Sequence, residues 1–180
     1  MMQKVRTYLL ALALVGGATV LHAQNFVTGS RMQRLSAKEW CNDRKPSLKR
    51  KAVLVEFFSS ANPSVLAHVE HLERIASANA ELLETVVIAR EPAEVMERIF
   101  PVGNRCFVAI DADGSLFDRY GVRTVPCTVL LDRRGRVVWS GDPATLTDER
   151  IGRATGGRRE LRQVRKADRQ RYRETIGKTQ

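Results

Sequence analysis

The stretch of chain that decides the fold is Val53-Leu54-Val55-Glu56-Phe57-Phe58-Ser59-Ser60-Ala61-Asn62-Pro63-Ser64. Its first six residues are aliphatic or aromatic apart from one glutamate, a composition typical of a strand buried on both faces. Apolar residues then recur at positions 65, 69, 72 and 75–76, the spacing of one helix face. In the turn between them, Ser59, Ser60 and Asn62 are candidate caps and Pro63 suits a first helical turn. The stretch predicts a strand that passes through a tight turn into a helix.

The segments that follow alternate between strand and helix patterns. A β-branched run at residues 85–89 completes a strand–helix–strand unit, whose two strands should be parallel with a right-handed crossover. A helix is expected over residues 93–100, followed by a short strand over 106–110. The next helix is expected to be capped by Ser115, to run through Tyr120 and to be closed by Gly121. This alternation predicts an α/β domain with helices covering the sheet.

The last part of the domain reads as a hairpin. Residues 122–132 form a β-branched run, Arg133-Arg134-Gly135 supplies a turn with a glycine, and a second strand follows over residues 136–139. A final helix is expected to begin near Leu146 and to run on into the C-terminal segment.

Three motifs, in order, resemble the thioredoxin superfamily, most closely its extracytoplasmic TlpA/ResA-like, or redoxin, branch. The first is the strand, aromatic pair and turn of residues 53–64. The second, residues 120–127, is similar to the segment that brings a cis-proline beside the active-site helix, and it places Pro126 in that role. The third, residues 131–141, is similar to the branch's Asp–Gly–Trp–Gly hairpin. The resemblance covers about residues 51–146 and implies a thioredoxin-like fold, with a central mixed sheet flanked by helices and an inserted helix and strand before the cis-proline strand.

The resemblance implies a Cys-x-Pro-Cys motif where this chain has Ala61-Asn62-Pro63-Ser64. Thioredoxin chemistry needs a thiolate at a helix N-terminus and a second thiol that resolves the mixed disulfide. An alignment on Pro63 puts Ala61 and Ser64 at those positions, and an alignment on the preceding glutamate puts Asn62 and Val65 there. Neither alignment supplies sulfur, so we expect no ordinary dithiol exchange.

Three cysteines, Cys41, Cys106 and Cys127, lie outside this turn. An odd number leaves at least one thiol without a disulfide partner in a monomer. Cys127 directly follows Pro126, so it should lie near the former active site and is the candidate for a single catalytic thiol. The alternative is a small buried residue that fills core space, as free cysteines often do. Cys106 begins a predicted strand and is expected in the core, and Cys41, in a less defined segment, is the one of the three most expected to be exposed.

Glu56, His68 and His71 are further candidate functional residues. The resemblance places Glu56 at the buried acid that serves the family's second cysteine. Without that cysteine, we expect its carboxylate to pair with a neighbouring base or to be hydrated at the end of the strand. The two histidines are three residues apart on one helix and could share a metal ion, but the sequence offers no third ligand. No metal and no cofactor is predicted.

The N-terminus predicts a secretory signal over residues 1–23. Lys4 and Arg6 precede an apolar run at residues 9–21, and Ala23 is a small residue at the expected cleavage site. An uncleaved anchor is the alternative, but 13 apolar residues fall short of the roughly 20 that span a bilayer. We expect export across the inner membrane to the periplasm. The predicted organisation is this signal, a flexible segment at 24–35, the thioredoxin-like domain at 36–152 and a basic tail at 153–180.

The net charge of +10 belongs to the ends of the chain. Residues 1–23 carry +2, and residues 150–180 carry +8, from 11 basic and 3 acidic side chains, which leaves 17 of each sign over residues 24–149. The tail is predicted to be a solvated helix or disordered, or else to contact an anionic envelope surface. Nucleic acid is not an expected partner outside the cytoplasm, and the oligomeric state stays open.

Two functions are consistent with these residues. The favoured one is a non-catalytic module that binds a protein or peptide in a groove formed by residues 61–64, Val125 and Pro126. The alternative is a thiol-disulfide oxidoreductase that works through Cys127 alone.

Overall fold

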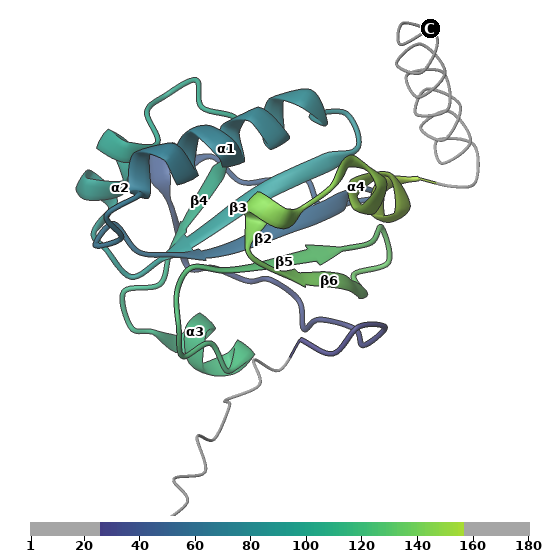
Figure 1. The fold of residues 1–180 in the computed structure, drawn as a ribbon. Helices are drawn as coiled ribbons and strands as arrows, with labels where there is room; N and C mark the ends of the chain where they lie inside the picture. The colour runs from purple at the N-terminus through teal and green to yellow at the C-terminus, as the bar shows by residue number, and fades with distance from the viewer. Residues whose placement is uncertain (1–25, 157–180) are drawn as a thin grey trace, which may run out of the picture.

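The computed structural model describes residues 26–156, so the predicted signal and most of the basic tail lie outside the described residues. Within this range a six-stranded sheet has the order β1-β4-β3-β2-β5-β6 (Figure 1). The strands are β1 Glu39–Trp40, β2 Ala52–Phe58, β3 Leu83–Ala89, β4 Phe107–Ile110, β5 Cys127–Leu131 and β6 Val137–Gly141. The helices are α1 Val65–Ala78, α2 Ala93–Ile99, α3 Ser115–Tyr120 and α4 Asp148–Thr155, with 3-10 turns at Cys41–Asp43 and Pro143–Thr145.

The sheet is mixed, as the sequence predicts. Strands β2, β3 and β4 are parallel neighbours, whereas β5 runs antiparallel to β2, β6 to β5, and β1 to β4. The predicted strand–helix–strand unit is therefore β2–α1–β3, and the predicted hairpin is β5–β6. The inserted helix and strand are α2 and β4, which lie in sequence between β3 and β5. The predicted fold class is confirmed.

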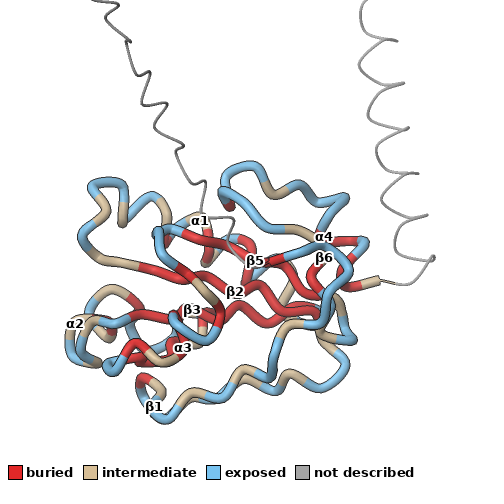
Figure 2. Tube along the Cα trace, turned by 90° about the horizontal axis from the view of Figure 1, so that it is seen from below, coloured by how far each residue is buried: buried red, intermediate tan, exposed pale blue. Residues whose placement is uncertain are grey.

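Helices cover the two faces of the sheet unequally. One face packs against α1, α2 and α4, through core residues such as Leu72, Met96 and Ile151. The other face packs against the short helix α3 and the N-terminal segment, through Phe117, Tyr120 and Phe26. Figure 1 shows α3 beneath one half of the sheet only, and Figure 2 shows that the buried residues follow the central strands. None of the helices between residues 26 and 156 has the length and apolar character that crossing a bilayer requires.

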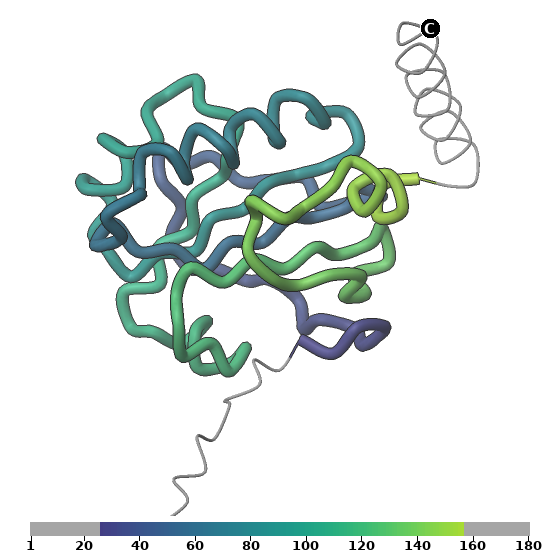
Figure 3. Tube along the Cα trace, viewed as in Figure 1, coloured from purple at the N-terminus to yellow at the C-terminus, as the bar shows by residue number. Residues whose placement is uncertain are grey.

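The N-terminal segment, residues 26–37, runs along the β5–β6 turn (Figure 3). The amide of Gly29 donates to the carbonyl of Val137 at 2.7 Å, and the amide of Met32 donates to the carbonyl of Gly135 at 2.9 Å. Phe26 is buried, with its ring 6.0 Å from that of Phe57. The sequence predicts a flexible segment up to residue 35, but the structure attaches its described part, residues 26–35, to the sheet through backbone hydrogen bonds.

The predicted cap of helix α3, Ser115, is instead the first residue of that helix, and Asp111 binds its leading amides. The carboxylate of Asp111, buried at the end of β4, accepts hydrogen bonds from the amides of Leu116 and Phe117 at 2.9 and 3.0 Å. A carboxylate at this position satisfies amides that have no partner within the helix. Ser115 is the first residue of the helix, and its own amide is bound by Asp113 at 3.1 Å.

Candidate binding groove at the end of strand β2

Sheet pairing brings the predicted site residues together at one edge. Phe57, near the end of β2, pairs with Cys127, the first residue of antiparallel β5. The turn after β2 and the residues before β5 therefore meet beyond the carboxyl ends of the parallel strands, where open α/β sheets place their ligands. The Val125–Pro126 peptide bond is cis.

A groove of about 390 Å³ lies between these two segments. Five of the predicted site residues line it: Ala61, Asn62, Pro63, Val125 and Pro126. Phe58, Ser59 and His68 complete the lining. The predicted Ser64 is exposed just before α1, and its carbonyl accepts the amide of His68 at 3.0 Å. The structure thus gathers the binding residues predicted from the motifs, with Ser64 beside the groove.

Asn62 caps the turn that leads into α1. Its side-chain oxygen accepts the amide of Ser64 at 3.0 Å, and its carbonyl accepts the amide of Val65 at 3.0 Å. Pro63 follows directly, at a position where a missing N–H costs nothing. These contacts are compatible with both alignments of the missing motif.

A buried polar cluster forms the floor beside the groove. Glu56 is fully buried, its Oε1 lies 2.8 Å from Nε2 of His68, and its Oε2 accepts a hydrogen bond from the hydroxyl of Thr128. The hydrogen bond to Glu56 raises the pKa of His68 and outweighs the opposing effect of burial. The base expected beside Glu56 is thus His68, which the sequence presented only as a weak candidate for a metal ligand.

His71 does not join this cluster. Its Nε2 lies 3.0 Å from the carbonyl oxygen of Pro143, and its Nδ1 lies 3.3 Å from the guanidinium of Arg74. In the part of the chain that the structure describes, no three His, Cys, Asp or Glu side chains are grouped so that they could hold a metal ion.

The side chain of Cys127 lies on the opposite face of the sheet from the groove. Because successive side chains of a strand alternate between faces, and Thr128 reaches Glu56 on the α1 face, Cys127 points to the α3 face. It packs there in the cluster of Phe57, Phe117 and Tyr120, with 3% of its surface exposed. Burial, together with the charge of Glu56, raises the pKa of the Cys127 thiol to about 12. Its place next to Pro126 in the chain does not bring its sulfur into the groove.

The other two thiols are also buried. Cys41 is 4% exposed and Cys106 is 2% exposed, and both lie in the core on the face of α1 and α2. Burial raises the pKa of Cys41 to about 11 and raises that of Cys106 further. Cys41, the thiol that the sequence favours for exposure, ranks first of the three by a narrow margin, but it is buried. The 3-10 turn packs it under α2, where the amide of Asn42 donates to Glu97. Within residues 26–156, which contain all three cysteines, no disulfide forms.

Val125 separates the groove from a second cavity of about 320 Å³. Arg90, Glu91 and Arg123 contribute charge to that cavity, and Phe117 contributes an aromatic wall. Val125 lines both spaces with 38% of its surface exposed, which is unusual for a large apolar side chain in this domain. Among the described residues, none forms a hydrogen bond with the backbone N–H or C=O of Val125.

A hydrogen bond joins the turn at residues 59–64 to Glu91, which lies just after β3. Its Oε1 accepts the amide of Ser60 at 2.5 Å. Burial raises the pKa of Glu91, but the hydrogen bonds from the serines of the turn outweigh it and leave the pKa below its usual value. The carboxylate is therefore charged, and its hydrogen bond with Ser60 fixes the turn that forms one wall of the groove.

Comparison with known proteins gives a likeness of structure. No protein-family model matches the sequence, and neither does any curated protein. A thiol-disulfide isomerase from Corynebacterium glutamicum superposes with a TM-score of 0.59 at 21% identity, over 72% of this chain and 97% of that one. A putative thiol:disulfide interchange protein DsbE from Chlorobium tepidum gives 0.53 at 21%, over 61% and 83%.

The likeness extends to PrxQ from Xylella fastidiosa, with a TM-score of 0.55 at 10% identity, over 79% of this chain and 98% of that one. All three structures match this chain at low sequence identity, between 10% and 21%, so the likeness is one of fold. The chain therefore has a thioredoxin-like fold.

Proposed function

We propose that this chain is an exported protein of the TlpA/redoxin type that binds an extended polypeptide beside Pro126 and does not exchange disulfides. The observation that carries the proposal is the turn at residues 59–64. It stands in front of α1, where thiol exchange needs a thiolate, and it contains no sulfur.

The positions of the three thiols support the proposal that the chain does not exchange disulfides. A thiolate is the nucleophile in disulfide exchange, and it must be accessible to its substrate. All three thiols are buried, and burial raises the pKa of each. A single-thiol enzyme based on Cys127 would have to bring that sulfur through the sheet to the groove, so we favour the binding module.

The exposed edge at Val125 supports the proposal that the chain binds an extended polypeptide. An extended peptide needs partners for its own N–H and C=O groups, and strand addition supplies them from the backbone of the receptor. The backbone groups of Val125 are available for this pairing, and its side chain stands between two cavities that can take alternate side chains of the ligand. The groove thus offers backbone groups that can pair with the peptide and cavities that can hold its side chains.

We also propose a location and an organisation for the chain on the basis of its sequence. Lys4, Arg6 and the apolar run at residues 9–21 support export by a secretory signal. We place a thioredoxin-like domain after that signal and before the basic tail, and we propose that the tail contacts an anionic envelope surface.

The test is binding of a polypeptide that cannot exchange thiols. A reduced and fully carboxymethylated protein is unfolded and has no reactive sulfur, so fluorescence anisotropy with it reports binding alone. Val125→Lys should weaken binding at least tenfold, the loss of about 1.4 kcal/mol expected for an interface residue of this kind. Val102→Lys is the matched control, because Val102 is 78% exposed and lies outside the groove. Equal binding by the wild type, Val125→Lys and Val102→Lys, or no binding by the wild type, would contradict the proposed function.

A further inference from the structure

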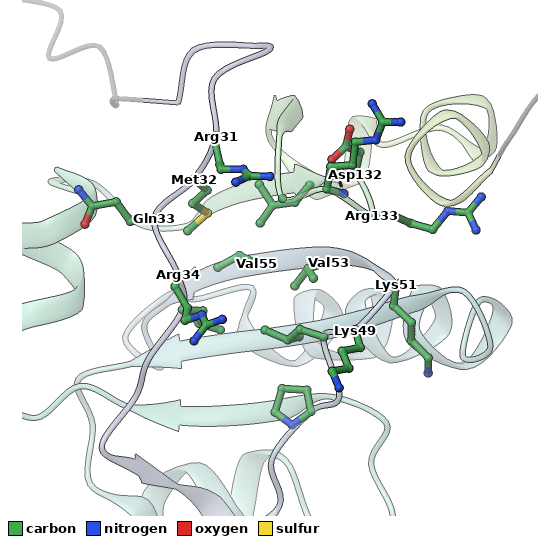
Figure 4. Close-up of a pocket in the computed structure, with 16 residues that line it drawn as sticks. Arg31, Met32, Gln33, Arg34, Lys49, Lys51, Val53, Val55, Asp132 and Arg133 are labelled. Atoms are coloured by element: carbon green, nitrogen blue, oxygen red, sulfur yellow. Dashed lines mark hydrogen bonds between the residues drawn. The ribbon is translucent and has the colours of Figure 1, made fainter.

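A further cavity of the described domain lies at the other end of the sheet from the groove. Its volume is about 640 Å³, and it opens between the N-terminal segment, the start of β2 and the β5–β6 turn (Figure 4). We infer that this cavity binds a single-chain anionic amphiphile, with the acyl chain on an apolar floor and the carboxylate among arginines at the mouth.

The floor is a part of the sheet that no helix within residues 26–156 covers (Figure 1). Val53 and Val55 on β2 and Leu131 on β5 line the cavity and are buried on the α3 face of the sheet. Helix α3 packs at the opposite end of that face, where Phe117 contacts Phe57 with ring centroids 5.2 Å apart. The half-buried side chains of Met32, Leu35 and Leu48 form the walls. A cavity of this volume with an apolar floor is in the range of small-molecule sites.

The mouth carries an excess of positive charge. Six of the sixteen lining residues are basic and one, Asp132, is acidic. The Oδ1 atom of Asp132 accepts the amides of Arg134 and Arg136 at 2.8 and 2.9 Å, so this carboxylate is engaged within its own turn. Lys51 is likewise engaged, because it forms an ion pair with Glu84 at 2.7 Å.

Arg31 and Arg34 are the cations best placed to receive a ligand. In Figure 4 both guanidinium groups extend from the N-terminal segment toward the side on which Val53 and Val55 lie, whereas Arg133 extends away from them. Neither arginine forms a hydrogen bond or an ion pair with another described side chain. A planar guanidinium binds a carboxylate through two parallel hydrogen bonds, so the pair can hold one anionic head group above the apolar floor.

The backbone around the floor argues for an acyl chain and against an extended peptide. Strand β2 lies between β3 and β5, and β5 lies between β2 and β6, so the ladders on both sides use their N–H and C=O groups. A buried peptide would leave its own backbone groups without partners on this floor, at a high cost in free energy. An acyl chain has no such groups, and its anionic head matches the charge of the mouth.

The test is titration calorimetry of the full chain with alkyl carboxylates below their micelle concentrations. Decanoate should bind about fifteenfold more tightly than octanoate, since each of its two additional buried methylenes contributes roughly fourfold in affinity. Decyltrimethylammonium, which has the same chain and the opposite charge, should bind at least tenfold more weakly than decanoate.

Variants then locate the site. The double variant Arg31→Gln/Arg34→Gln should weaken decanoate binding at least tenfold and leave binding of neutral 1-decanol unchanged. Arg98→Gln/Arg105→Gln removes the same charge away from the cavity and should bind decanoate like the wild type. Val125→Lys should also bind decanoate normally, which separates this site from the groove. Melting curves confirm that each variant is folded.

Three results would overturn the inference. One is equal affinity for octanoate and decanoate, and another is a loss of affinity in the control pair as large as in the Arg31 and Arg34 pair. The third is binding of a peptide of alternating Glu and Leu residues without any binding of decanoate, which would assign the cavity to a polypeptide.

Discussion

Nε2 of His68 lies 2.8 Å from Oε1 of Glu56, a carboxylate with no exposed surface. The contact joins α1 to β2 directly beneath the groove, and Thr128 adds a hydrogen bond from β5. Three elements of the candidate site thus meet at one buried carboxylate. Removing one partner of such a cluster leaves a charge or a polar atom buried without compensation.

The first prediction concerns the pH dependence of stability. The hydrogen bond to Glu56 raises the pKa of His68 in the folded protein. The protonated imidazole therefore stabilises the fold, and this contribution is complete at pH values below the ordinary histidine pKa of about 6.5. It is lost as the pH rises through the raised pKa of the folded state. His68→Gln should therefore lower the free energy of unfolding by about 3 kcal/mol at pH 5.5 and by clearly less at pH 9. Urea unfolding across this range measures the difference.

His71→Gln is the control for this experiment, because His71 bonds to a backbone carbonyl and not to a carboxylate. An equal loss of stability by His68→Gln at every pH would show that the pair carries no net ionic contribution.

The second prediction concerns thiol reactivity. All three cysteines are buried and burial raises the pKa of each, so iodoacetamide at pH 7.5 should modify none of them within minutes in the native protein. All three should react once guanidinium unfolds the chain. Mass spectrometry counts the added groups, and rapid native labelling of Cys127 would contradict the orientation described for that side chain.

The third prediction concerns the start of α1. Asn62 caps the turn that enters this helix, so a cysteine there would lie closer to the positive end of the helix dipole than one at position 61. Asn62→Cys should have a thiol pKa below about 7.5, whereas that of Ala61→Cys should stay near the ordinary value of about 8.5. Thiolate absorbance followed against pH gives both values, and the reverse order would favour the alignment on Pro63.

The fourth prediction concerns the basic tail, whose structure lies outside the described residues. Residues 150–180 carry +8, so deletion of residues 157–180 should abolish retention on anionic vesicles and leave the melting temperature nearly unchanged. Retention of the full chain should fall steeply above about 0.15 M salt, where the screening length is roughly 8 Å. If the truncated chain unfolds, the tail is part of the core, and if it still binds, the attachment site lies within the domain.

Much of the fold follows from local patterns in the sequence. The β-branched runs give β2, β3 and β5, and the apolar spacing after Ser64 gives the buried face of α1. The glycine-bearing turn gives the β5–β6 hairpin. These signals are local, because each depends on residues within one element and its adjoining turn.

The features that the sequence did not predict depend on contacts between distant segments. Strand β5 is buried on both faces, so its pattern does not show which face Cys127 occupies, and only the polar Thr128 beside it marks the side of Glu56. Cys41 is buried because a 3-10 turn packs under α2. The cavity near Val53 exists because residues 26–37 cross the sheet where α3 does not reach.

The most direct test of the central claim is the reduction of insulin disulfides by dithiothreitol in the presence of the purified protein. With no sulfur in the groove and all three thiols buried, we expect the rate to equal that of dithiothreitol alone. Turnover well above that rate, abolished by Cys127→Ser in a variant that still folds, would contradict the account and establish a single-thiol oxidoreductase.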